Sequence, residues 1–236
     1  MSNNLGALLS ATFYERGYEH LVEVIHQRDD ASRRRLDALD VAVWDEAGGR
    51  LTSPPVDPGR EILDVEALVA AVPAAPARVM VTFDARYDPA IFPYRPHHYA
   101  YLHRRGSPAP ALYYAVNAGL GGVPDRIGAT NLNNFETYVF RRRPLAERYS
   151  LLLGCLSRWA PVEATVTAHY GQARLTREVR LAPRAHVEVP LAAEHAGERL
   201  ARVELKALFR LVAYVVGRAE AGGELVLFDH LFTYFK

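Results

Sequence analysis

The chain has 236 residues, of which 50% are hydrophobic and 23% are charged, and its formal net charge is +1. This is ordinary globular composition, and it gives no electrostatic reason to expect a nucleic acid or a membrane surface as partner. The single cysteine cannot form an intrachain disulfide, and no stretch has the roughly 18 apolar residues of a membrane-spanning helix. Because the first residues also lack the pattern of a secretion signal, we expect a cytoplasmic protein.

The first patterned segment, residues 4–16, has Leu5, Leu8, Leu9 and Phe13 at helical spacing. This spacing predicts a short N-terminal helix or an irregular arm. After it a period of two dominates, as in HLVEVIH at 20–26 and DVAVW at 40–44, which is typical of β-strands. Residues 61–72 have the composition of a helix, but the internal match considered below favours a strand.

A segment rich in proline and aromatic residues, RYDPAIFPYRPHH, occupies positions 86–98. Insertions between strands lie at the surface and often carry function, although prolines there can also serve to block edge pairing. The strand that follows alternates strictly. One face carries the side chains that we consider the best candidates for binding, namely His97, Tyr99, Tyr101, His103 and Arg105.

Residues 117–134 are rich in glycine and asparagine and have no apolar period, which indicates a linker. We therefore predict two domains, 1–124 and 125–236. The final segment, 224–236, is apolar on both faces of a predicted strand. One face would fill a core, and the other would meet the first domain or another subunit. Asp229 and His230 interrupt this strand, and neighbouring side chains of a strand point to opposite faces.

An internal match is the strongest feature of the sequence. Residues 99–117 and 212–230 share length and layout, with Tyr101 matching Tyr214 at an offset of 113. Four more anchor pairs follow in the same order, at offsets between 117 and 124: Glu19 with Glu136, Asp40 with Glu163, Asp64 with His186, and Arg78 with Arg202. The match predicts a duplication. The alternative is that β-rich chains resemble one another because alternating patterns use few residue types.

The drop in offset from 124 to 113 places about 11 extra residues in the first half, between Arg78 and Tyr101. Regular strands and frequent turn signals then predict an all-β protein of two tandem antiparallel β-sandwiches. An immunoglobulin-like or C2-like topology of about seven strands per copy is the expectation, with a duplicated jelly roll as the competitor.

No nucleophile, phosphate-loop or metal-ligand motif is present, so we predict no catalytic residues, no metal and no cofactor. The leading hypothesis is a non-enzymatic binding or assembly protein. Its partner, a protein or a small ligand, would contact the aromatic and histidine surface of the first domain, and the apolar C-terminal strand would support self-association. The candidate binding residues are Tyr94, His97, Tyr99, Tyr101, His103, Arg105 and His230.

Two alternatives stay open. One is an enzyme, either metal-dependent through its histidines or a cofactor-free cyclase or isomerase, with a pocket at the domain junction. The other is a lipid-surface module of C2 type. The near-neutral charge and the lack of an acidic calcium cluster argue against this second alternative.

Overall fold

The computed structural model describes residues 6–24, 36–88, 97–118, 133–140, 148–208, 211–219 and 223–234. It is 63% strand and 4% helix, which confirms the all-β prediction. The chain forms two compact units, Met1–Val123 and Pro124–Lys236, here called the first and second units. No helix among the described residues is long and apolar enough to cross a membrane.

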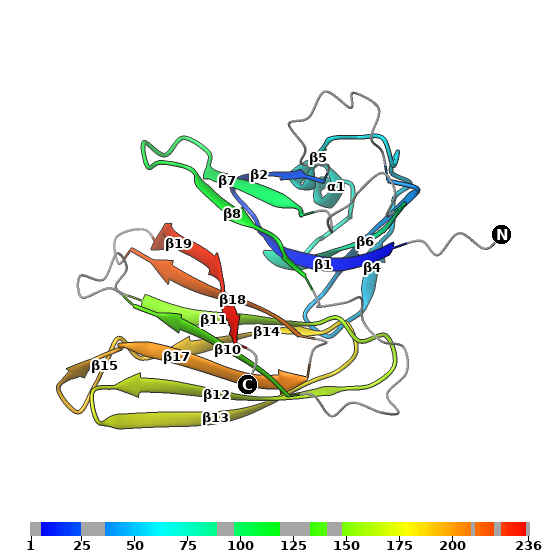
Figure 1. Ribbon diagram of the computed structural model, residues 1–236. Helices are drawn as coiled ribbons and strands as arrows, with labels where there is room; N and C mark the ends of the chain where they lie inside the picture. The colour runs from blue at the N-terminus through cyan, green and yellow to red at the C-terminus, as the bar shows by residue number, and fades with distance from the viewer. Residues whose placement is uncertain are drawn as a thin grey trace. The chain divides into compact units, whose positions relative to one another are not determined.

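The first unit consists of two antiparallel sheets (Figure 1). Sheet A has the order β4-β3-β6-β1-β9, and sheet B has the order β5-β2-β7-β8. The strands of sheet A are β1 (Gly6–Glu15), β3 (Ala38–Trp44), β4 (Arg50–Thr52), β6 (Arg78–Tyr87) and β9 (Asn117–Ala118). Those of sheet B are β2 (Tyr18–Glu23), β5 (Ile62–Asp64), β7 (Tyr99–Arg104) and β8 (Leu112–Ala115).

The second unit also consists of a five-stranded and a four-stranded sheet. Sheet C has the order β13-β12-β17-β10-β20, and sheet D has the order β14-β11-β18-β19. The strands of sheet C are β10 (Asn133–Val139), β12 (Val162–Tyr170), β13 (Ala173–Leu181), β17 (Arg202–Leu208) and β20 (Phe232–Tyr234). Those of sheet D are β11 (Arg148–Cys155), β14 (His186–Leu191), β18 (Leu211–Arg218) and β19 (Leu225–His230).

The strand orders of the two units are the same. We match β10–β14 with β1–β5, and β17–β20 with β6–β9. The strand order of sheet C then equals that of sheet A, and the order of sheet D equals that of sheet B. The units differ after their fifth strand. The first has helix α1 (Val65–Ala70) there, and the second has a small hairpin of β15 (Glu194–His195) and β16 (Glu198–Arg199).

Strand registers also correspond. In sheet A, Val43 lies opposite Val81, and in sheet C, Val166 lies opposite Leu205. These positions are separated by the offsets of 123 and 124 that the sequence anchors give. One anchor pair is on the wrong strands, because Glu19 lies in β2 whereas Glu136 lies in β10, the counterpart of β1. The register of sheet D makes β11 the counterpart of β2.

Both sheets of the second unit contribute to one core. Strand β12 alternates buried and exposed side chains, as a strand with one covered face should. Leu151 and Val215 of sheet D join Val166 and Leu205 of sheet C in a single cluster of buried side chains. Cys155 belongs to the same cluster, as expected for a small core residue. The tight turn between β12 and β13 uses Gly171, whose φ of 55° lies in the left-handed region.

The predicted N-terminal helix is wrong for residues 6–15, which form β1 between β6 and β9 in sheet A. Residues 1–5 lie outside the described part. The seven consecutive residues 8–14 of β1 are all buried, so apolar residues occupy both faces and any spacing can be found among them. Periodicity therefore could not distinguish helix from strand here, whereas the Thr, Phe and Tyr content of the segment favours a strand.

The strand prediction for residues 61–72 is also only partly right, because β5 ends at Asp64 and α1 begins at Val65. The Asp64 carboxylate caps the helix by accepting a hydrogen bond from the Ala67 N–H at 3.0 Å. The internal match could not predict this helix, since the two units diverge after their fifth strand.

Replacing Asp64 by Ala should destabilise the first unit by about 1 kcal/mol, because the first turn of α1 loses its capping oxygen. Asp64→Asn keeps an acceptor at the same place and should leave stability almost unchanged. Urea unfolding followed by Trp44 fluorescence, in a Trp159→Phe background, measures both. Equal losses in the two variants would contradict the capping role.

The C-terminal run is not the single strand that its pattern predicts. It forms β19 in sheet D and β20 in sheet C, and the chain passes between the sheets at Leu231, which is 1% exposed. Apolar residues occur on both faces because the run serves two sheets. Val226 and Leu227 pack against the core cluster that contains Leu231. Self-association through this segment stays a prediction.

Candidate functional site

The outer face of sheet B carries the aromatic side chains that the sequence singles out. Along β7, Ala100 and Leu102 are buried, whereas Tyr99, Tyr101 and His103 are partly exposed. This burial pattern confirms the predicted alternation. The inner residues face sheet A and form the core of the first unit, so the outer residues make up a separate surface, here called the aromatic face.

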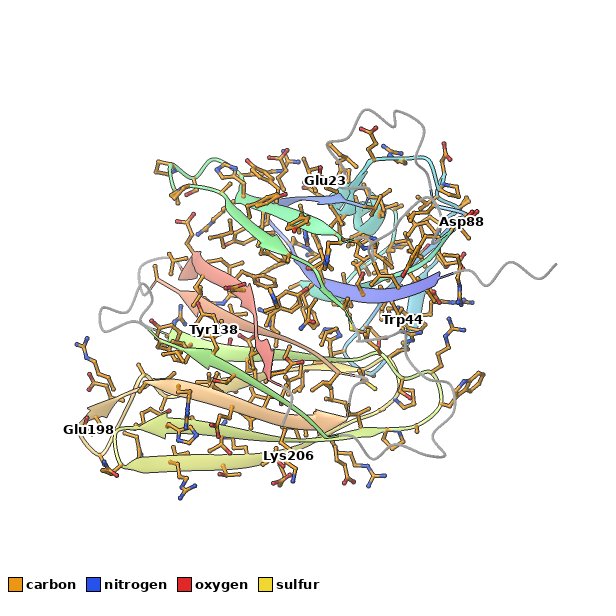
Figure 2. All side chains as sticks on the ribbon, in the orientation of Figure 1. Glu23, Trp44, Asp88, Tyr138, Glu198 and Lys206 are labelled. Atoms are coloured by element: carbon orange, nitrogen blue, oxygen red, sulfur yellow. The ribbon has the colours of Figure 1, made fainter. Side chains whose placement is uncertain are left out.

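Antiparallel pairing fixes which side chains of the aromatic face are neighbours. Tyr99 lies between Glu23 of β2 and Ala115 of β8, and Glu23 lies opposite Ile62 of β5. In the next row, Tyr101 lies between Leu21 and Tyr113, and Leu21 lies opposite Asp64. In the third row, His103 lies opposite Glu19. Residues of four strands thus form one continuous patch. Glu23 of β2 is labelled in Figure 2.

Three tyrosines form the centre of the aromatic face. The rings of Tyr99 and Tyr113 are stacked, with centroids 5.6 Å apart and planes 3° apart. The Tyr113 hydroxyl donates a hydrogen bond to Glu23 Oε2 at 3.2 Å. The Tyr101 and His103 rings lie 6.3 Å apart. Stacking and hydrogen bonding limit the rotamers of these rings, so the surface is ordered before any ligand arrives.

The aromatic face exposes large apolar side chains. Tyr113 is 60% exposed and Ile62 is 51% exposed. Exposed large apolar side chains grouped with polar neighbours are typical of interaction surfaces, whereas scattered single ones are ordinary. The corresponding face of the second unit contains Val212, Tyr214 and Val216, which are buried.

Carboxylates surround the rings. Glu19, Glu23 and Asp64 lie in the rows of the aromatic face, and the four strands place no lysine or arginine there. At the border, Arg105 donates to both carboxylate oxygens of Glu66, at 3.1 and 2.6 Å. The hydrogen bond to Glu66 raises the pKa of Arg105, and the charges of Glu66, Glu19 and Asp64 add to this effect. Arg105 is thus already paired with Glu66 at the edge of the face.

The structure places the other predicted residues as follows. His97 is exposed just before β7, and Arg105 follows its last residue. Tyr94 lies outside the described residues. His230 belongs to β19 of the second unit. The binding role of each of these residues stays a prediction.

The expectation that Asp229 and His230 point apart is wrong. His230 Nδ1 lies 3.3 Å from Asp229 Oδ1, and the same oxygen accepts the His230 backbone N–H at 2.9 Å. A short aspartate side chain can fold back along its own strand to reach the next amide, and this brings it beside the neighbouring ring.

A second polar cluster lies inside the first unit, between its sheets. Tyr114 Oη is 2.7 Å from Thr12 Oγ1 of sheet A and 3.0 Å from His20 Nε2 of sheet B. Nearby, Ser10 Oγ is 3.0 Å from His98 Nδ1, and the His98 ring contacts the edge of Phe83. All of these side chains are less than 5% exposed. We call this set the polar core.

The second unit has leucines at the corresponding places. Matching the registers of sheets B and D pairs His20 with Leu151, His98 with Leu211, and Tyr114 with Leu231. These three leucines are buried. The register of sheets A and C, in contrast, pairs Thr12 with Glu136, which is also buried, so the two cores differ at the histidine and tyrosine positions.

Burial sets the protonation of the polar core. It lowers the pKa of His20 from 6.5 to about 3, because the charged imidazolium would lose its hydration. Burial also raises the pKa of Tyr114 above its ordinary range, and the hydrogen bond with Thr12 only partly offsets this. Both groups are neutral at physiological pH, which suits a structural network rather than acid–base chemistry near pH 7.

Among the described residues, no three His, Cys, Asp or Glu side chains come together as metal ligands would. Sequence reasoning missed Glu19, Glu23 and Ile62 as parts of the aromatic face. Alternation puts the two glutamates on the face of β2 opposite to His20, but only the pairing of β2 with β5 and β7 brings them beside the tyrosines. Strand pairing between distant segments has no local signal.

No protein-family model, no curated protein and no solved structure matches this chain.

Proposed function

We propose that the protein is a non-enzymatic binding or assembly protein that contacts its partner through the aromatic face of the first unit. The observation that carries this proposal is the stacked ring pair of the partly exposed Tyr99 and the exposed Tyr113, on the same sheet face as the exposed Ile62. Tyrosines supply large contact area and a polar hydroxyl at small entropic cost, and clusters of them are enriched in binding surfaces.

We further propose that the two units descend from duplication of one nine-stranded sandwich. Shared strand order and shared register support this, together with the anchor pairs of β3, β6 and β7 with their counterparts. On this view the two copies have diverged: the first gained the aromatic face and the polar core. An immunoglobulin-like or C2-like classification of the sandwich, the cytoplasmic location and the enzyme alternative remain predictions.

Replacing Tyr99 and Tyr113 together by Ala should abolish retention of the natural partner, because both halves of the stacked pair are lost. Native mass spectrometry of the protein purified from its own host gives the readout, as the mass of partner or ligand retained by each variant. The apparent melting temperature of the first unit should stay within about 3 °C of the wild type, since partly exposed rings contribute little to the core.

Trp159→Ala is the matched control, because Trp159 is a 74% exposed aromatic residue of the second unit. It should keep the partner. Tyr94→Ala tests the predicted residue outside the described part in the same assay. Undiminished retention in the Tyr99/Tyr113 variant would refute the proposal, and so would a drop in melting temperature large enough to show that the rings hold the fold together.

A further inference from the structure

We infer that β13 of the second unit pairs with β13 of a second copy of this chain, so that sheet C of one copy continues into sheet C of the other. The inference goes beyond the proposed function, because it concerns the other unit and does not involve the aromatic face. Three observations lead to it: the length and regularity of this edge strand, the direction of its backbone groups, and the sequence of charges along it.

Strand β13 is the long, regular edge strand of the described part. It has nine residues, pairs with β12 without a register shift, and is the outermost strand of sheet C (Figure 1). The other described edges are short or interrupted. Strands β4, β5, β8, β9, β15, β16 and β20 have at most four residues, β14 contains Pro190, and β19 pairs with β18 across a register shift. Short length, proline and bulges all prevent edge pairing, and β13 has none of these three.

The backbone of β13 turns alternate groups away from β12. His169 of β12 lies opposite Arg174, and the His169 carbonyl accepts the Ala201 N–H at 2.9 Å, on the side of β17. In an antiparallel sheet, both backbone groups of a residue point to one side and those of the next residue to the other. Arg174, Thr176 and Glu178 therefore direct their N–H and C=O groups outward. Two copies of this strand can form about six hydrogen bonds with one another through these groups.

The charges on β13 favour one register of self-pairing. A two-fold axis perpendicular to the sheet at Thr176 places Arg174 of each copy opposite Glu178 of the other. The two Thr176 side chains then lie opposite each other, and all three residues are exposed. The Thr165 hydroxyl donates to Glu178 Oε2 at 2.9 Å, which holds this carboxylate on the outer side of the sheet. Opposite charges and threonine pairs at directly opposed positions stabilise a strand pair.

Neighbouring registers are less favourable. An axis at Arg177 would place Arg174 opposite Arg180 and Arg177 opposite its own copy, and an axis at Glu178 would oppose two carboxylates. An axis one residue before Thr176 opposes no charges of unlike sign. An axis at Val179 pairs Glu178 with Arg180, but over a shorter stretch of the strand. The charges of β13 thus select a register rather than prevent pairing.

The inner side of β13 is compatible with this register. Arg177 points to that side, where a charge can block an edge, but its guanidinium donates to the Pro190 carbonyl of β14 at 3.0 Å. Its side chain therefore reaches toward sheet D instead of beyond the edge. The first unit offers no comparable strand, because β4, the counterpart of β13, has three residues and a register shift opposite β3. Self-association is thus assigned to the second unit.

Sedimentation equilibrium of the full chain in low salt, at about 100 µM, tests the inference; we expect a reversible dimer, as is typical of a small interface. Arg174→Glu and Glu178→Arg each create two opposed pairs of like charges. Each should weaken dimerisation at least about tenfold. An equimolar mixture of the two variants should dimerise again, since every glutamate at these positions then meets an arginine. This recovery also shows that both variants are folded.

The matched control is Arg50→Glu, which makes the same change of charge at an exposed position of β4 and should leave the dimer unchanged. Tyr99→Ala/Tyr113→Ala should leave it unchanged as well, so the outcome is independent of the proposed function. A monomeric wild type would overturn the inference. So would a dimer that persists in Arg174→Glu and Glu178→Arg, as association through the C-terminal segment would, or a mixture of these variants that stays monomeric.

Discussion

Lowering the pH from 6.5 toward 3 is expected to reduce the unfolding free energy of the first unit by several kcal/mol, and replacing His20 by Leu should remove most of that loss. The folded-state pKa of His20 is lowered to about 3, whereas an unfolded histidine titrates near 6.5. Between these values the unfolded chain binds the proton and the folded chain does not. The unfolding free energy of the first unit is therefore at its full value above pH 6.5. Below that pH it falls by about 1.4 kcal/mol per pH unit.

Position 20 is well suited to this test. The His20 imidazole contacts the Tyr114 hydroxyl. The centroid of its ring lies 6.4 Å from the centroid of the Tyr14 ring. Neither group supplies a negative charge near neutral pH, since burial also raises the pKa of each phenol. A proton on His20 would therefore stay uncompensated unless the unit opened. Leucine is what the second unit has at the matching position, so His20→Leu fits a comparable space.

Urea unfolding at several pH values measures the effect. Each unit has one tryptophan, and a Trp159→Phe background leaves Trp44 as the reporter of the first unit. Trp44 suits this role because its indole N–H donates to Thr82 Oγ1 at 2.9 Å inside the folded sheet. Parallel slopes for wild type and His20→Leu between pH 6 and 4 would exclude His20 as the source of acid sensitivity.

Tyr114→Phe should destabilise the first unit by about 1–3 kcal/mol at pH 7. The hydroxyl bridges Thr12 and His20, so its removal leaves two buried polar groups without this partner. Removing one member of a buried network costs more than replacing several members by apolar groups. The double variant His20→Leu/Tyr114→Phe should therefore be more stable than Tyr114→Phe alone.

The same fluorescence assay, at constant pH 7, measures these two variants and His20→Leu as a double-mutant cycle. A coupling energy near zero between positions 20 and 114 would mean that the bridge contributes nothing. Leu231→Ala in the second unit, followed by Trp159 fluorescence in a Trp44→Phe background, is a useful reference, because it creates a plain cavity at the position corresponding to Tyr114. Its cost should not change with pH.

Strand content and the faces of individual strands followed from the sequence, because alternation is a local property. Burial along β2, β7 and β12 follows the period of two. The helix at 65–70 and the strand at 6–15 did not follow. At α1 the deciding feature was a single capping aspartate, and in β1 burial on both faces removed the periodic signal.

The candidate site was predictable only in part. Tyr99, Tyr101 and His103 share a strand, so their common face could be read directly. The glutamates that give the face its charge come from a strand about eighty residues earlier in the chain. The internal match found the right partner for β7 but assigned β2 to the wrong counterpart, so the contrast between histidines and leucines in the two cores became visible only through the registers.

Two units with one strand order have a consequence for folding. While both are incomplete, β11 of one unit is a geometrically acceptable substitute for β2 of the other, and tandem copies are prone to such exchange. If β11 took the place of β2, Leu151 would lie beside the Tyr114 hydroxyl. If β2 took the place of β11, His20 would lie beside buried leucines instead of Tyr114. Each mistaken assembly thus lacks the buried hydrogen bond between His20 and Tyr114. The chemical mismatch between the cores therefore favours each strand in its own half of the chain.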